Sequence, residues 1–232
     1  MPRTVLLRDW LDRHLVRSHT EEELKNGYSL EPASADASFR RYFRVSLPDG
    51  STRIVMDAPP ELEDCRPFLE VAALLREAGV HAPEVFAEDL SQGFLLLSDL
   101  GSTTYLSVLN ADTAPKLYRD ANAALVDIQR ASRSGVLPEY DRALLTRELN
   151  LFPDWYVARH LGIALDEKQD ATLRAVFEKI LANNLAQPKV FVHRDYHSRN
   201  LMVVDGGYPA NPGVIDFQDA VYGPITYDLV SL

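Results

Sequence analysis

The sequence is poor in cysteine and has no long apolar run. Cys65 is the single cysteine among 232 residues, which excludes an internal disulfide and favours a reducing compartment. The acidic stretch 61–64 beside it opposes thiolate formation, so a catalytic thiol is disfavoured. No run of 18 apolar residues predicts a transmembrane helix. Residues 1–10 carry charges and lack the apolar centre of a signal peptide. We therefore expect a cytoplasmic protein with no membrane partner.

Positive charge is scarce as well. The chain has 24 Lys and Arg against 34 Asp and Glu, a formal net charge of −10. Such a surface repels nucleic-acid backbones and anionic membranes, so we expect neither as a partner. ATP remains compatible with this charge, because Mg²⁺ and a few local basic residues can hold a nucleotide. Apolar residues make up 46% of the chain, and its length suffices for one large domain or two lobes; the oligomeric state is not indicated.

The most informative stretch is 190–217. Three short apolar runs in it predict strands, at 190–192, 201–204 and 213–215. A polar loop, 193–200, separates the first two strands, and a glycine-rich turn at 205–207 precedes the third. Pairing of the second and third strands would bring Asn200 close to Asp216.

These side chains predict a site for a hard divalent cation. Asn200 and Asp216 offer two oxygen ligands, and Mg²⁺ takes few protein ligands and shares the rest with phosphates. Asp195 lies five positions before Asn200, near enough to face the same ion without being bound to it. It is therefore free to accept a proton from an attacking hydroxyl. This equipment suits phosphoryl transfer, where positioning and charge neutralisation do most of the catalysis.

The residues of this stretch also form a known pattern. H-x-D-x-H-x-x-N at 193–200, followed by I-D-F at 215–217, resembles the catalytic loop and metal-binding motif of the protein-kinase-like superfamily. Protein kinases carry Lys where this chain has His197, whereas aminoglycoside phosphotransferases and choline-kinase-like enzymes carry His. The short interval between Asp216 and Asp228 also leaves no room for a regulated activation loop. The resemblance is therefore to the aminoglycoside phosphotransferase family.

The resemblance implies an α+β, bilobal protein-kinase-like fold. Residues 1–100 would form a nucleotide-binding N-lobe with an antiparallel sheet and a helix. Residues 101–232 would form a mainly helical C-lobe with short catalytic β hairpins, which binds the substrate. Relatives continue for several helices beyond Asp228, so we expect this lobe to be incomplete at its C-terminal end.

The resemblance also implies roles for the motif residues. Asp195 would position the acceptor hydroxyl and take its proton, while Asn200 and Asp216 would bind Mg²⁺. Asp219 is a further candidate metal ligand. His193 would brace the loop near the metal motif, and Asp228 would tie the following helix to the loop backbone. For His197 two roles stay open, support of the loop and contact with the transition state.

Periodicity predicts the elements of the N-lobe. Helices are expected at 4–16 and 60–78, and strands at 39–45, 54–56, 85–86 and 94–97. The tract of small residues at 33–38 takes the place of the kinase phosphate-covering loop, although it contains no G-x-G-x-x-G. Ser34 and Ser38 there are candidate donors to phosphates. An ordinary β-hairpin with a polar tip is the alternative.

One position departs from the superfamily pattern. The third strand normally ends on a Lys or Arg that contacts the nucleotide phosphates, but here it ends on Asp57. A carboxylate beside a triphosphate would repel it, so either another cation serves or the alignment of this strand with the pattern is off. Arg41, on the apolar face of its strand, is the first candidate, ahead of Arg40, Arg44 and Arg53. Glu70 is a candidate ion-pair partner for that arginine, with a plain surface glutamate as the alternative.

The hinge between the lobes is predicted at 98–101. Backbone N–H and C=O groups of Ser98, Asp99 and Leu100 would recognise the adenine edge. Helices follow at 114–131, at 141–160 with a break at Pro153, and at 171–185.

The segment 148–156 is rich in groups that suit a sugar. Glu148 offers a carboxylate for hydroxyls, and Trp155 and Tyr156 offer aromatic faces for stacking. Core packing is the favoured interpretation of these aromatic residues, because aromatic residues at helical spacing are usually buried.

Almost the whole chain resembles one group within the family. Segments 35–44, 55–60 and 148–156 are similar to the bacterial N-acetylmuramate/N-acetylglucosamine anomeric kinases, which serve peptidoglycan recycling. The resemblance implies ATP-dependent phosphorylation of a sugar hydroxyl, with Mg²⁺. Two alternatives stay open: a kinase for an aminoglycoside, a choline-like alcohol or an amino alcohol, and a nucleotide-binding pseudokinase module, which Asp57 would suit.

Overall fold

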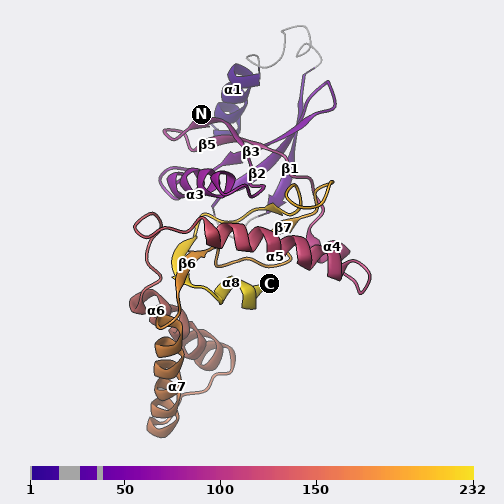
Figure 1. Cartoon of the computed structure of the whole chain (residues 1–232). Coiled ribbons are helices and arrows are strands. Elements are labelled where there is room, and N and C mark those ends of the chain that lie inside the picture. The colour runs from indigo at the N-terminus through magenta and orange to yellow at the C-terminus, as the bar shows by residue number, and fades with distance from the viewer. Residues whose placement is uncertain (1, 16–26, 36–38) are drawn as a thin grey trace. The chain divides into compact units, whose positions relative to one another are not determined.

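The computed structural model describes residues 2–15, 27–35 and 39–232, without the side chains of residues 34 and 35. The chain forms two compact units (Figure 1), of which the first comprises Met1–Ala124 and Ser198–Gln218 and the second Leu125–His197 and Asp219–Leu232. The lobe boundary near residue 101 stays a prediction. None of the described helices is long and apolar enough to cross a membrane.

The first unit is built on an antiparallel sheet of five strands in the order β1-β2-β3-β5-β4. The strands are β1 (Ser29–Ala35), β2 (Arg41–Ser46), β3 (Thr52–Asp57), β4 (Val85–Asp89) and β5 (Phe94–Ser98). The turn between β2 and β3 closes through a hydrogen bond of 3.0 Å from Gly50 N to Leu47 O. Gly50 has φ 84°, a conformation that glycine adopts without a Cβ clash. The four strands predicted in this sheet are therefore confirmed, with bounds that differ by a few residues, and β1 is a strand that the sequence did not predict.

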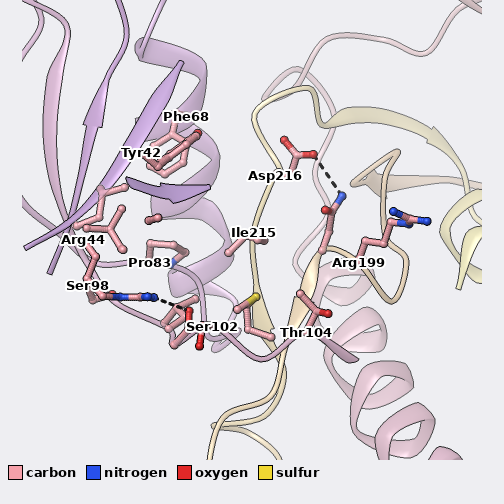
Figure 2. A pocket seen from close by; sticks show the side chains of 17 residues that line it. Tyr42, Arg44, Phe68, Pro83, Ser98, Ser102, Thr104, Arg199, Ile215 and Asp216 are labelled. Atoms are coloured by element: carbon pink, nitrogen blue, oxygen red, sulfur yellow. Dashed lines mark hydrogen bonds between the residues drawn. The ribbon is translucent and has the colours of Figure 1, made fainter. Parts of the chain in front are cut away.

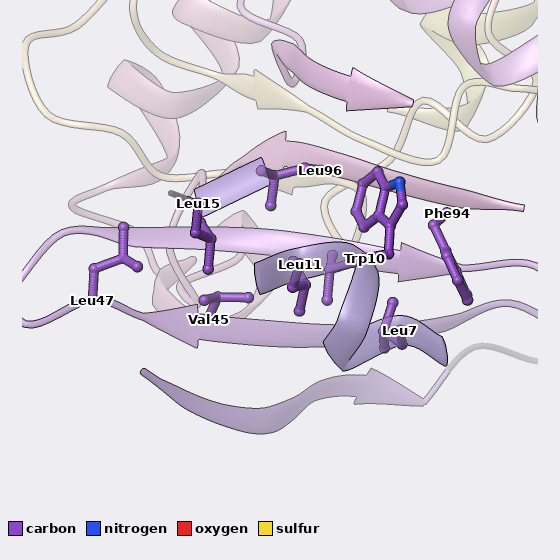
Figure 3. Close-up of a cluster of buried hydrophobic side chains, with 9 residues drawn as sticks. Leu7, Trp10, Leu11, Leu15, Val45, Leu47, Phe94 and Leu96 are labelled. Carbon is purple, nitrogen blue, oxygen red and sulfur yellow. The ribbon is translucent and has the colours of Figure 1, made fainter. Parts of the chain in front are cut away.

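Helix α1 (Arg3–Leu15) supplies the core of this unit. Its residues at helical spacing bury one face against the sheet (Figure 3), as the sequence predicted. The cluster comprises Leu7, Trp10, Leu11, Leu15, Val45, Leu47, Val55, Phe94 and Leu96. Burial of each large apolar side chain stabilises the fold by about 1.5–3 kcal/mol, so α1 is an integral part of the sheet domain.

Helix α3 (Arg66–Glu77) begins later than the predicted start at Pro60. Residues before it form turns, with Leu62 N donating to Pro59 O over 2.9 Å. Pro67 lies in the first helical turn, where its missing N–H leaves no bond unmade. The predicted apolar face is confirmed by buried Phe68, Val71, Ala72 and Leu75, and Gly79 follows the helix end as predicted.

A short hairpin completes the first unit. Strand β7 (Leu201–Met202) pairs with β8 (Gly213–Val214) in the register Leu201↔Val214. The predicted strand 201–204 is too long, because Val204 N donates to the side chain of Asn211 over 3.0 Å instead of continuing the ladder. Asn211 is buried, and its amide also donates to Tyr105 in α4 (Tyr105–Val108) and to Asp120, each over 2.8 Å. The hairpin is thus fixed to the body of its unit.

The second unit is mainly helical. Strand β6 (Lys189–Val192) pairs with β9 (Val221–Pro224), a strand that the sequence did not predict. The helices are the end of α5 (Ala114–Arg130), α6 (Arg142–Leu151), α7 (Glu167–Leu185) and α8 (Tyr227–Ser231). Their core is the cluster Tyr140, Leu145, Leu181, Val190, Val192 and Val221.

Two helix boundaries differ from the prediction. Pro153 does not break the helical run; α6 continues as the π-helix η1 (Phe152–His160), which ends with Leu161 N donating to Tyr156 O, five residues earlier. The proline sits at the start of η1, where its missing N–H is tolerated. Helix α7 begins at Glu167 instead of 171, because Asp166 and Gln169 form a reciprocal capping box.

Candidate active site

The first unit contains a pocket of about 470 Å³. Its lining comes from β2, β3 and β5, the segment after β5 and the β7–β8 hairpin (Figure 2). The lining residues include Tyr42, Arg44, Ile54, Leu97, Ser98, Leu100, Gly101, Met202, Asn200, Ile215 and Asp216. The pocket therefore has a polar end on the hairpin, and its other end lies beside the segment 97–101, where Arg44 also lines it (Figure 2).

Asn200 and Asp216 lie together at the polar end. Asn200 precedes β7 and Asp216 follows β8, so the pairing of these strands brings their side chains to 3.3 Å between Nδ2 and Oδ2 (Figure 2). The adjoining backbone is tied as well, with Ile215 N donating to Asn200 O over 3.1 Å. Gln218 donates to the second carboxylate oxygen of Asp216 over 2.9 Å.

This pair has the chemistry of a magnesium site. It offers a carboxylate and an amide oxygen, the hard ligands that Mg²⁺ prefers. The described residues contain no group of three or more His, Cys, Asp and Glu side chains suited to a metal. Asp216 has φ 64°, an unfavourable conformation for a residue with a Cβ, and such conformations concentrate at functional sites.

The predicted hinge lies at the other end of the pocket. Ser98 and Leu100 line the pocket, and Ser98 exchanges hydrogen bonds of 2.8 and 2.9 Å with the backbone of Glu84. Asp99 turns to Arg44, whose guanidinium donates to both of its oxygens over 2.6 and 3.0 Å and to Gly101 O over 3.0 Å. Burial alone would raise the pKa of Asp99, but the hydrogen bonds led by that from Arg44 outweigh it and lower the pKa. Arg44 thus ties β2 to the hinge.

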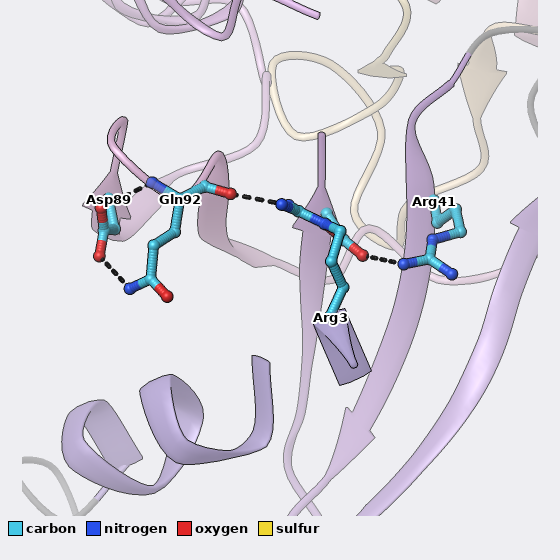
Figure 4. A network of polar contacts seen from close by, with 5 residues as sticks. Arg3, Arg41, Asp89 and Gln92 are labelled. Atoms are coloured by element: carbon cyan, nitrogen blue, oxygen red, sulfur yellow. Dashed lines mark hydrogen bonds and ion pairs between the residues drawn. The ribbon is translucent and has the colours of Figure 1, made fainter. Parts of the chain in front are cut away.

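Asp57 does not face the pocket. Its side chain is fully buried and accepts bonds of 2.9 and 2.5 Å from Nε and Nη2 of Arg3, with Arg41 bound to its other oxygen (Figure 4). Arg3 also donates to Gln92 O over 2.7 Å and lies over the ring of Phe94. The expected repulsion of a triphosphate by Asp57 is therefore wrong, because two arginines neutralise this carboxylate inside the fold.

The other residues predicted to contact the nucleotide are Arg41, Glu70, Ser34 and Ser38, and neither Arg41 nor Glu70 is among the described residues that line the pocket. Arg41 pairs with Asp57 and is not among the lining residues, whereas Arg44 is. Glu70 is exposed, and the structure gives it no ion pair within the residues that it describes. Ser34 lies in β1 opposite Tyr42, and Ser38 lies outside the described residues. Their roles stay predictions.

The second unit contains residues 193–197 of the predicted catalytic loop. Asp228 is buried and accepts hydrogen bonds from His193 N over 2.7 Å and from Arg194 N over 3.0 Å, which is the contact that the sequence predicts. Burial raises the pKa of Asp228 to about 6, although the two backbone N–H groups oppose this shift. Asp195 is exposed, and its N–H lies 3.3 Å from Nδ1 of buried His193.

Two further features mark this loop. Arg194 has φ 77°, so both non-glycine residues of the described chain with positive φ belong to the predicted motifs. Nδ1 of His197 is buried and has no hydrogen-bond partner in the part of the chain that is described. Asp219 is exposed, and its backbone oxygen accepts from Arg194 over 3.3 Å.

The predicted sugar-binding residues separate into two groups. Glu148 is engaged: it accepts a bond of 2.5 Å from Arg194 Nη2 and another from the hydroxyl of Tyr140. Trp155 and Tyr156 are 56% and 50% exposed on η1, so the favoured interpretation of core packing is wrong for both.

Sequence reasoning missed three contacts. The pairs Arg3–Asp57 and Arg44–Asp99 join residues more than 50 positions apart, and Arg194 joins Glu148 over 46 positions. Only Arg44 had a signal, because strand alternation places it opposite the apolar face of β2.

Comparisons with known proteins agree with this geometry. The chain is 55% identical over 203 residues to the N-acetylmuramate/N-acetylglucosamine kinase of Pseudomonas aeruginosa, which covers 88% of this chain and 59% of that protein. It is 46% identical over 236 residues to the protein of the same name from Neisseria meningitidis serogroup B, covering 100% of this chain and 66% of that protein. The chain thus spans about three fifths to two thirds of the length of these relatives.

Solved structures confirm the α+β protein-kinase-like fold. An ADP-bound aminoglycoside phosphotransferase, APH(2'')-Ib, matches with a TM-score of 0.64 at 16% identity over 94% of this chain and 73% of that one. Choline kinase LicA from Streptococcus pneumoniae matches with a TM-score of 0.60 at 15% identity over 94% of this chain and 75% of that one. Residues 29–232 match the profile of the Phosphotransferase enzyme family. Because that match covers most of the chain, the chain belongs to this family.

Proposed function

We propose that this chain is the greater part of an ATP-dependent kinase that phosphorylates the anomeric hydroxyl of N-acetylmuramate or N-acetylglucosamine in the cytoplasm. The observation that carries the proposal is the Asn200–Asp216 pair, which opens into the same pocket as the hinge segment 98–101. The names of the relatives at 46% and 55% identity support the choice of sugar. As in other phosphoryl transfers, the protein would act mainly by positioning the two substrates and by neutralising the charge of the phosphates.

The nucleotide would occupy the pocket of the first unit. Its adenine would lie between the apolar side chains of Leu97 and Met202 and bond the hinge backbone near Leu100. Asn200 and Asp216 would hold Mg²⁺, which supplies charge neutralisation at the phosphates. Arg44 would keep the hinge in place through its bonds to Asp99 and Gly101.

The acceptor hydroxyl would be handled by the catalytic loop. Asp195 follows Arg194, whose backbone N–H donates to the buried carboxylate of Asp228. This hydrogen bond fixes the backbone next to the proton acceptor. Asp195 would take the proton from the sugar hydroxyl as it attacks the terminal phosphate. Trp155 and Tyr156, exposed on η1, would offer faces for the sugar ring.

The decisive experiment is phosphorus NMR of the full-length protein with Mg-ATP and N-acetylmuramate. A new anomeric phosphate signal is expected. Asp195→Asn should reduce turnover by about 10²–10⁴-fold, the usual weight of a positioned proton acceptor. Near-normal turnover of this variant would refute the assignment of Asp195, and phosphate transfer only to an aminoglycoside or choline-like alcohol would refute the assignment of the sugar.

A pseudokinase module is less well supported than the sequence suggested. Asp57 was its main motive, and this residue is buried against two arginines instead of opposing a nucleotide. ATP binding without transfer to any sugar or alcohol would restore that alternative.

A further inference from the structure

The guanidinium of Arg194 connects the catalytic loop to two other segments of the second unit. Its Nη2 donates to Glu148 of α6 over 2.5 Å, and its Nη1 donates to the backbone oxygen of Asp219 over 3.3 Å. The backbone N–H of Arg194 donates to Asp228. Arg194 therefore joins the loop, α6 and the segment that begins at Asp219.

Glu148 is the charged partner in this arrangement. One carboxylate oxygen accepts from Arg194 and the other from the hydroxyl of Tyr140. Side-chain exposure is low on both sides of the ion pair, 25% for Arg194 and 23% for Glu148, so water screens the pair less than a surface pair. A sugar hydroxyl would have to compete with two established donors for this carboxylate.

Tyr140 fixes Glu148 from the core side. Its ring is buried in the cluster of the second unit and packs against Tyr227 with ring centroids 5.3 Å apart. Burial, followed by the bond to Glu148, raises the pKa of Tyr140, so its hydroxyl stays protonated and remains a donor. The carboxylate is thereby held between a core hydroxyl and the loop guanidinium.

The loop needs such support because of its backbone. Arg194 has φ 77°, a conformation that an L-residue with a side chain adopts at an energetic cost of about 1–3 kcal/mol. Asp195 is the next residue, so any rotation of Arg194 toward a relaxed conformation displaces the carboxylate that accepts the proton. Asp228 holds the N–H of Arg194, and Glu148 holds the far end of its side chain.

We propose that Glu148 is a positioning residue, which sets the backbone of Asp195 through Arg194, and that it is not a ligand of the sugar. The activity consequence rests on the proposed kinase function, whereas the effect on the loop does not. The distinction is measurable, because a sugar ligand affects KM, while a positioning residue affects kcat.

The first test compares Glu148→Gln with Glu178→Gln in the full-length protein. Glu178 pairs with Arg142 over 2.9 Å on the exposed surface of the same unit, so its loss should change nothing measurable. Glu148→Gln should lower kcat about 10- to 100-fold and leave KM for the sugar within about twofold. A rise in KM for the sugar of tenfold or more with kcat near that of the wild type would overturn the proposal.

Tyr140→Phe gives a milder second variant if Glu148→Gln does not fold. It removes the hydroxyl that donates to Glu148 and keeps the ring in the core. Its effect on kcat should be smaller, and the double variant should be no slower than Glu148→Gln alone, because Tyr140 acts through Glu148. Additive losses would overturn the chain of contacts.

Hydrogen exchange separates this inference from the proposed function. Amides of residues 193–195 should exchange about tenfold faster in Glu148→Gln than in the wild type or in Glu178→Gln, whether or not a substrate is known. Unchanged exchange would overturn the inference. If the amides exchanged faster but the protein phosphorylated no amino sugar, the role of Glu148 in holding the loop would stand and the proposed function would be rejected.

Discussion

Replacement of Asp57 tests the buried ion pairs of the first unit. Its carboxylate is fully buried and accepts three bonds, two from Arg3 and one from Arg41. Breaking a buried pair typically costs about 3–5 kcal/mol. Arg3 and Arg41 are 27% and 49% exposed, so both can regain water when Asp57 is lost, which favours the lower end of that range. We expect Asp57→Asn to lower the free energy of unfolding by about 3 kcal/mol.

The assay is thermal and urea unfolding followed by circular dichroism. A loss of about 3 kcal/mol corresponds to a fall in Tm of about 6–12 °C for a chain of this size. Asp57→Lys, which introduces the residue type usual at this strand end in the superfamily, should be worse, because it places a third cation beside two arginines. It should also fail to tighten ATP binding, since position 57 lies outside the pocket lining.

The control is Asp64→Asn. Asp64 pairs with Arg66 at 2.8 Å, but both side chains are well exposed, at 49% and 71%, so its Tm should stay within about 2 °C of the wild type. If Asp57→Asn were as stable as this control, the buried network would contribute no stability and the reasoning would be refuted.

Three further predictions concern the pH dependence, the packing and the metal. Burial raises the pKa of Asp228 to about 6, so the native state keeps this proton to a higher pH than the unfolded state does. The free energy of unfolding should therefore fall by about 3 kcal/mol as the pH rises from about 4 to 6. Urea unfolding of Asp228→Asn should lack this part of the pH dependence, and an unchanged pH dependence would contradict the burial argument. Gly223→Ala should cost about 1–3 kcal/mol, because a Cβ there would lie 2.7 Å from Cβ of Tyr140; an unchanged Tm would show that β9 can shift. Asp216→Asn should raise the Mg²⁺ concentration for half-maximal turnover at least about tenfold with little change in Tm, and an unchanged Mg²⁺ requirement would remove Asp216 from the metal site.

Local features of the fold were predictable from the sequence. Two short strands joined by a turn have few partners other than each other, so the pairing of β7 with β8, and with it the approach of Asn200 to Asp216, followed from chain order. The apolar faces of α1 and α3 followed from spacing alone. The start of α7 was predicted four residues too late, although Asp166 and Gln169 have the spacing of a capping box that marks it.

Contacts between distant segments were not predictable. Nothing near Arg3 in the sequence indicates Asp57, and nothing near Glu148 indicates Arg194, because these pairs depend on how whole elements pack. The same holds for β6, whose partner β9 lies beyond the motif that drew attention to it. The acid at position 57, where the superfamily pattern has a base, was therefore interpreted as facing a triphosphate and repelling it, whereas it is paired with two arginines within the fold.

The seating of α1 has a practical consequence for anyone who designs a shorter version of this protein. The family profile begins at residue 29, which invites removal of everything before it. Such a truncation would remove Trp10 and three leucines from the core beside the sheet, and it would remove both hydrogen bonds that Arg3 donates to Oδ1 of Asp57. In the shortened chain the apolar face of the sheet that α1 covers would be exposed to water, and we expect the protein to aggregate before its activity could be assayed.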